Sequence, residues 1–154
     1  MSFLDKAKEG LARATQFVKD KAVVSLPSEP CKIIEMPEFN RGVAIAYCDS
    51  PGPLEKKGET FYAISPTPSD WTPQRVDSFY REYNLAMLEN LTVHEAMPGH
   101  FLQAMHANRF KATNPIRAIF GSGTFVEGWA TYTEQVMAGL GFGGTAVKMQ
   151  QLKM

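Results

Sequence analysis

The chain has 154 residues, of which 44% are hydrophobic and 21% charged, and these values are ordinary for a single globular domain. Sixteen Lys and Arg residues balance sixteen Asp and Glu residues, so the sequence lacks the basic excess typical of nucleic-acid-binding proteins. The longest uninterrupted apolar stretch, residues 43–48, is far shorter than the roughly 20 residues that a membrane-spanning helix needs. We therefore expect neither nucleic-acid binding nor a transmembrane segment.

The N-terminal segment and the cysteines bear on localisation. Charged residues interrupt the first ten positions, so they do not form the apolar core of a signal peptide. A complete chain would stay in the cytoplasm, whereas a fragment of a longer protein could have lost an export signal. The two cysteines, Cys31 and Cys48, have neither a zinc-knuckle spacing nor the number needed for a disulfide framework, so we expect two buried free thiols.

The first predicted element is an amphipathic helix over residues 2–21, where small and apolar residues recur at helical spacing between charged ones. Its apolar stripe needs a partner, and its alanine-rich composition favours core or subunit packing over a membrane surface. A homodimer is therefore a reasonable expectation. Two prolines end this segment, so we divide the chain into a helix with its linker, residues 1–30, and a domain over residues 31–154.

Three stretches at the start of this domain have strand-like composition, and the segments between them are rich in turn residues. The second and third stretches flank a loop over residues 49–58, which predicts a long-looped hairpin with one further strand. The predicted strands cover residues 31–36, 42–48 and 60–65.

After a proline-rich linker, the apolar spacing becomes helical from Val76 and continues into the pair His94-Glu95. A second helical pattern covers residues 125–137, and four glycines between residues 139 and 144 then leave a short tail. Strands followed by helices are typical of the α+β class, so we expect a small antiparallel sheet with helices on one face. Because the tail offers no closing element, we expect a partial domain of a longer protein.

The three histidines, His94, His100 and His106, all fall within thirteen residues. The first two stand in the sequence HEAMPGH, which is close to the zinc motif H-E-x-x-H but places the second histidine at i+6 instead of i+4. On an unbroken helix these side chains would lie about 120° apart and could not share an ion. Pro98 and Gly99 can break the helix and return His100 toward His94, or they can simply mark an ordinary helix end. The spacing leaves both possibilities open.

A catalytic zinc site typically has three protein ligands and an open position for water. Glu127, 27 residues after His100, is an acidic residue near the start of the second helical pattern. A carboxylate at a helix start is also favoured by the helix dipole alone. The nearby His94-Glu95 pair makes Glu127 our candidate for the third ligand.

The motifs HEAMPGH and VEGWATY resemble a bacterial family known as domain of unknown function 885 and, more distantly, the gluzincin metallopeptidases. The resemblance runs from about Glu35 to Gly141. It implies a zincin-like fold in which His94, His100 and Glu127 bind Zn²⁺ and Glu95 is the general base. Members of the family are several hundred residues long, which implies that this chain holds only the active-site region.

The resemblance favours a zinc-dependent hydrolase of the metallopeptidase type, in which metal-activated water attacks a peptide or amide carbonyl. One alternative is a truncated and inactive module that binds metal or forms oligomers. Another is a non-haem iron enzyme, because two histidines and one glutamate also form a facial triad.

Further residues have possible supporting roles. Glu134 and Thr131 lie seven and four residues after Glu127, so both project from the same helix face and could orient a ligand histidine. A surface ion pair explains Glu134 equally well. His106 and Tyr132 are candidate donors to a developing oxyanion, but ordinary packing or a surface position is the favoured interpretation of each. In a zincin-like arrangement, the strand over residues 60–65 would be the edge strand along the cleft, where a peptide substrate can add.

Overall fold

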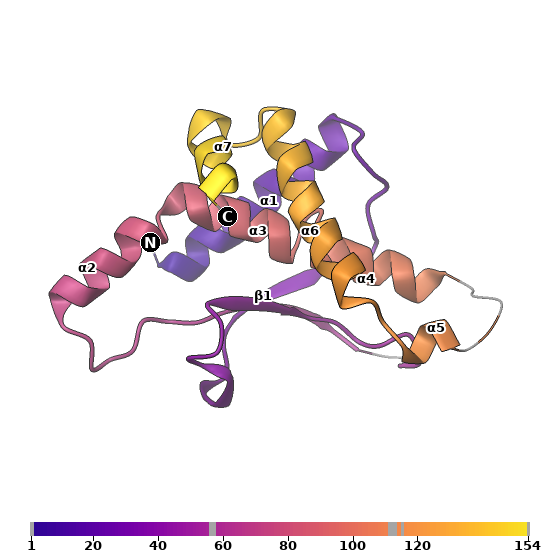
Figure 1. Cartoon of the computed structure of the whole chain (residues 1–154), viewed down its shortest axis with the longest axis horizontal. Helices are drawn as coiled ribbons and strands as arrows, with labels where there is room; N and C mark the ends of the chain where they lie inside the picture. Colours follow the sequence, from indigo (N-terminus) through magenta and orange to yellow (C-terminus); the bar gives the residue numbers. More distant parts are fainter. Residues whose placement is uncertain (1, 56–57, 111–113, 115, 154) are drawn as a thin grey trace.

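The computed structural model describes residues 2–55, 58–110, 114 and 116–153. Three strands, β1 (Cys31–Glu35), β2 (Ala46–Asp49) and β3 (Thr60–Ile64), form one sheet, and helices cover one of its faces (Figure 1). The fold therefore belongs to the predicted α+β class. Among the described residues, no helix combines the length and the apolar character needed to cross a membrane. The described helices are α1 (Phe3–Asp20), the 3-10 helix η1 (Glu38–Asn40), α2 (Pro73–Glu82), α3 (Leu85–Glu95), α4 (His100–Arg109), α5 (Ile116–Ile119), α6 (Gly123–Gly139) and α7 (Gly144–Lys153).

The sheet is mixed, so the prediction of an antiparallel sheet is wrong. Strands β2 and β3 form the predicted long-looped hairpin, with Ala46 opposite Ile64, but β1 pairs in parallel with the other edge of β3. The strand order β1-β3-β2 places β3 in the centre, where its residues Tyr62 and Ile64 are almost fully buried. The strand over residues 60–65, which we expected at an edge of the sheet, is thus the central strand β3. The two edges are formed by β1 and β2.

Helix α1 finds its partner within the chain. Its residues Ala7, Ala14 and Val18 are fully buried, and the helix packs against α3. Gly10 faces Thr92 of α3 in this contact, and a Cβ atom there would lie 3.7 Å from Oγ1 of Thr92, within ordinary van der Waals contact. The expectation of core packing is therefore confirmed, and the apolar stripe of α1 no longer argues for a homodimer.

The continuous helical pattern before His94 is divided between two helices. Helix α2 ends at Glu82, and the side chain of Asn84 then accepts hydrogen bonds from the amides of Ala86 and Met87, which caps the start of α3. Apolar spacing alone cannot reveal this break, because both helices keep the same period. The cap thus defines the start of α3, the helix whose last turn contains His94.

The C-terminal tail, expected to lack structure that closes the fold, forms helix α7. Phe142 and Val147 are buried, and α7 packs on α3 and α6. Gly143 has a positive φ of 63°, and a Cβ atom there would overlap the side chain of Val147. The glycines that end α6 therefore also allow the chain to turn back and cover the core.

Candidate metal centre

The turn between α3 and α4 brings His94 and His100 together. His94 lies in the last turn of α3, and His100 is the first residue of α4. Between them, the amide of Gly99 donates to the carbonyl of Val93 at 2.9 Å, and a Cβ atom on Gly99 would lie only 1.7 Å from the carbonyl oxygen of His94. Only glycine allows the backbone to cross itself this closely. As a result, the two imidazole rings meet edge to face with centroids 4.7 Å apart, so the break returns His100 to His94 even though His100 is also the first residue of the next helix.

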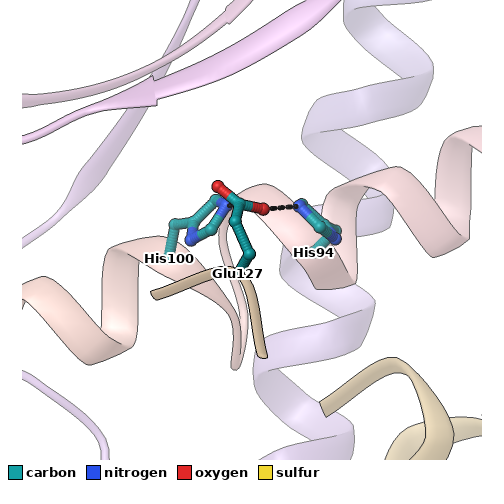
Figure 2. A group of neighbouring side chains, drawn as sticks. All are labelled: His94, His100 and Glu127. Carbon is teal, nitrogen blue, oxygen red and sulfur yellow. Dashed lines mark ion pairs between the residues drawn. The ribbon is translucent and has the colours of Figure 1, made fainter. Parts of the chain in front are cut away.

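Glu127, from the second turn of α6, reaches the same point (Figure 2). Its Oε2 atom lies 3.6 Å from Nε2 of His94 and 3.6 Å from Nε2 of His100. Ligand atoms bound tetrahedrally at 2.0–2.1 Å from a zinc ion would lie about 3.3 Å apart. The three side chains therefore offer donor atoms at a spacing that fits a metal ion.

Trp129 explains how α6 is held in position. Its indole Nε1 donates to the carbonyl of Pro98 at 2.9 Å, in the turn that joins the two histidines. Because Glu127 and Trp129 are two residues apart on the same helix, this hydrogen bond joins the part of α6 that bears Glu127 to the turn between the two histidines.

Glu134 contacts His94 at Nδ1, the ring nitrogen that points away from the cluster. Its carboxylate is almost fully buried, with Oε1 lying 2.6 Å from Nδ1 of His94 and Oε2 accepting a hydrogen bond of 2.8 Å from the side chain of Asn90. A proton on Nδ1 leaves the lone pair of Nε2 directed at Glu127 and His100, as metal binding requires. Burial disfavours the charged imidazole, but the Glu134 hydrogen bond and the surrounding carboxylates outweigh it and raise the pKa of His94.

His100 and Glu95 are both shifted toward their neutral forms. Burial, reinforced by the nearby His94, lowers the pKa of His100, and its Nδ1 atom is buried with no hydrogen-bond partner among the described residues. Burial raises the pKa of Glu95 to about 7, against the attraction of His94 and a hydrogen bond from the backbone of Cys48. Only 7% of Glu95 is exposed, and this residue lines the same pocket as the cluster.

The pocket has a volume of about 590 Å³ and forms a groove between β2 and α4. One wall consists of β2 and the loop that follows it, and the other is the face of α4 that begins at His100. Its described lining includes three carboxylates and no lysine or arginine. These carboxylates belong to Asp49, Glu95 and Glu127.

Three of the predicted supporting residues lie away from the cluster. The ring of His106 faces the opposite side of α4, where Nε2 lies 2.9 Å from the carbonyl oxygen of Ser25. Tyr132 is 57% exposed and packs beside Trp129, and Thr131 is also exposed. His106 and Tyr132 follow His100 and Glu127 by six and five residues, which rotates them to other helix faces. The structure therefore does not bring either side chain to the cluster, in line with the packing or surface position that the sequence favours for both.

Sequence reasoning missed Asn90 and Trp129. Asn90 lies one helical turn before His94, and a polar residue at that place in an otherwise apolar helix is a signal for a buried hydrogen bond. Trp129 carries no such signal, because a tryptophan in an apolar helix is most simply explained by packing.

Solved structures resemble the chain over nearly its whole length. A candidate lipoprotein of unknown function from Shewanella oneidensis is 33% identical, with a TM-score of 0.80 over 98% of this chain and 26% of that protein. Another candidate lipoprotein, from Colwellia psychrerythraea, is 24% identical, with a TM-score of 0.67 over 94% of this chain and 24% of that protein, and shows the fold alone. The chain thus spans about a quarter of the length of either protein.

No curated protein matches the sequence. The family described as "Bacterial protein of unknown function (DUF885)" is recognised over residues 2–154. Since this range includes every element of the fold and every residue of the candidate metal centre, the chain belongs to the DUF885 family.

Proposed function

We propose that the chain carries the active-site region of a zinc-dependent hydrolase of the metallopeptidase type, with a zincin-like arrangement of its metal-site helices. The observation that carries this proposal is the convergence of His94 Nε2, His100 Nε2 and Glu127 Oε2 at a spacing suited to one ion. Two neutral imidazoles and a carboxylate form a ligand set typical of catalytic zinc.

The residues around the cluster supply complementary roles. A zinc ion held by these ligands would polarise a substrate carbonyl and lower the pKa of a bound water to about 7. Glu95 follows a ligand directly in the sequence, and its carboxyl group lies in the groove, within the electrostatic influence of His94 and Glu127. We assign it the role of general base, which accepts the proton of the attacking water and passes it to the leaving amine.

The edge position of β2 supports a peptide substrate. Ser65 donates its amide to the carbonyl of Ile45 at 2.8 Å, and the antiparallel ladder alternates from there. Ala46 and Cys48 therefore direct their backbone amides and carbonyls away from β3, into the groove. The backbone of Cys48 already donates to the Glu95 carboxyl, so a peptide would pair with the Cys48 carbonyl and with the backbone of Ala46. An extended peptide can add to such an edge through main-chain hydrogen bonds, next to the metal ligands.

The test is metal content, measured by mass spectrometry on protein purified without a metal-affinity column. We expect about one zinc per native chain, a comparable amount in Glu95→Gln, and little in His100→Ala. Hydrolysis of a peptide library at high protein concentration should disappear in Glu95→Gln although its zinc remains. Native protein that fails to bind zinc would contradict the proposal, and iron with oxygen-dependent turnover would support the non-haem iron alternative.

A second candidate is a metal-binding module without catalytic activity. The Glu127 side chain is 68% exposed, so the candidate centre is open to solvent on the side of α6. Zinc binding combined with identical peptide turnover in the native chain and in Glu95→Gln would favour this module.

A further inference from the structure

The groove beside the metal cluster ends at a contact between two of its own walls. At the C-terminal end of α4, the side-chain amide of Asn108 donates to the carbonyl of Pro51, in the loop after β2, at 2.7 Å. We call this hydrogen bond the latch. It joins the two walls of the groove at the end opposite His100, because His100 and Asn108 lie at opposite ends of the same helix.

A second cavity begins on the other side of the latch. Its volume is about 470 Å³, and both Pro51 and Asn108 line it as well as the groove. The latch is therefore the partition between two neighbouring hollows. The second cavity differs in chemistry, because it is lined by the ion pairs Lys32–Glu59 and Arg109–Glu29.

The distance from the metal cluster to the latch limits the number of peptide residues that fit in this part of the groove. Asn108 follows His100 by eight positions in α4, and eight helical steps correspond to about 12 Å along the helix axis. An extended peptide rises about 3.3 Å per residue, so this part of the groove has room for about three or four residues. Ala104 and Ala107 line it, and their small side chains leave space for such a peptide beside the edge of β2.

We propose that the latch between Asn108 and Pro51 sets the length of substrate that the groove accepts. The substrate class is a short extended peptide with about three or four residues between the metal and the latch. This inference rests on the proposed function, since it takes the peptide to lie along β2. Asn108 acts as a specificity-determining residue, and opening the latch joins the groove to the second cavity.

The experiment measures peptide length dependence in the Glu95→Gln background, which prevents turnover. Acetylated and amidated alanine peptides of two to six residues are titrated into the full chain, and binding is followed by amide chemical shifts in NMR spectra. We expect affinity to rise up to about four residues and then to stay level or fall. Adding Asn108→Ala should let affinity continue to rise, so that the six-residue peptide binds about fivefold more tightly than before.

Two further variants make the result specific. Asn108→Asp keeps the size of the side chain but removes the donor to Pro51, so it should reproduce the profile of Asn108→Ala. Gln16→Ala is the matched control, because it also removes a side-chain amide donor, to Asp20 on the exposed side of α1, but Gln16 lines neither hollow, so its profile should remain that of the parent. Circular dichroism verifies that each variant is folded.

The latch proposal is overturned if affinity rises through six residues in the parent, if the Asn108 variants share its profile, or if no peptide binds. Zinc content measured on the same samples reports separately on the proposed function. The peptides carry no chelating group, so their length profile still tests the latch if zinc is absent.

Discussion

At the scale of single residues, the strongest support for the candidate metal centre comes from Glu134, which contacts the ring nitrogen of His94 that points away from the cluster. Glu134 is almost fully buried, yet it is hydrogen-bonded to both His94 and Asn90. A buried carboxylate is costly unless its oxygens are satisfied, and here two buried polar side chains, Glu134 and Asn90, orient one imidazole. Packing alone does not explain a buried hydrogen-bond network that ends at a candidate metal ligand.

We therefore expect Glu134→Gln to weaken zinc binding about tenfold to hundredfold. The amide keeps the shape of the side chain, but it sets an NH₂ group against the donating amide of Asn90 or against the N–H of His94. The measurement is competition for zinc against a chelating dye. Thr131→Ala is the control, because Thr131 is exposed on the same helix and its replacement should leave zinc affinity unchanged. Equal affinities in Glu134→Gln and the native chain would show that Glu134 does not support the site.

The two thiols lead to a second prediction at this scale. Burial raises the pKa of both Cys31 and Cys48 to about 12, so almost no thiolate is present at pH 8. We expect iodoacetamide to alkylate the folded chain at least about a hundredfold more slowly than the chain in guanidinium. Mass spectrometry of timed samples measures both rates. Comparable rates in the two conditions would mean that the thiols are accessible and ionise normally in the folded protein.

The sequence identified the residues of the cluster but not their geometry. His94, His100 and Glu127 could be selected from their types and motifs, whereas the i+6 spacing left open whether the histidines meet. That outcome depends on the path of four backbone residues, and on a contact between Gly99 and the His94 carbonyl that no helical period describes. For His106 and Tyr132 the sequence left an oxyanion role open beside ordinary packing, because spacing alone does not show which helix faces point into the groove.

At the scale of elements, the turn between α3 and α4 determines whether the site can exist. A Cβ atom at Gly99 would overlap the backbone of Val93 and His94, which cannot move without breaking the end of α3. We expect Gly99→Ala to lower the free energy of unfolding by at least about 3 kcal/mol and to abolish zinc binding. Chemical denaturation measures the first effect, and metal content measures the second.

Gly128→Ala is the matched control for that substitution. Gly128 lies within α6, where a Cβ atom would meet nothing within 4 Å, so alanine should raise the free energy of unfolding by about 0.5–1 kcal/mol. Zinc binding should persist, although Gly128 is adjacent to Glu127. If the two variants were equally stable, the close backbone crossing at Gly99 would be wrong.

Local elements were easier to predict than their arrangement. The helical spacing of α1, the strand composition of β3 and the hairpin of β2 with β3 are all visible in the sequence. The parallel addition of β1, which makes β3 central, is not visible, because strand order depends on contacts between distant segments. Helix α7 was missed because its apolar residues do not follow a helical spacing, and among its described residues Val147 alone is buried.

At the scale of the whole molecule, the candidate site is enclosed on the side of β2 and α4 and open to solvent on the side of α6. The groove is bounded by β2 and α4, but Glu127 is 68% exposed, and large apolar side chains are exposed on α5 and at the start of α6. Exposed apolar residues that gather in one region often mark a surface for contact with other protein. Family relatives about four times as long have chain available to cover such a region. The exposed residues are Ile116, Ile119, Phe120 and Phe125.

This open side leads to a prediction about activity. Metal-activated hydrolysis depends on a site from which bulk water is excluded, because electrostatic interactions with the developing charge are weak in bulk water. We expect the 154-residue chain to bind zinc but to hydrolyse a peptide library only weakly or not at all. Zinc loading near one ion per chain, checked by mass spectrometry, removes metal content as the cause. Rapid turnover by the short chain alone, lost in Glu95→Gln, would show that β2 and α4 already enclose the substrate well enough for catalysis.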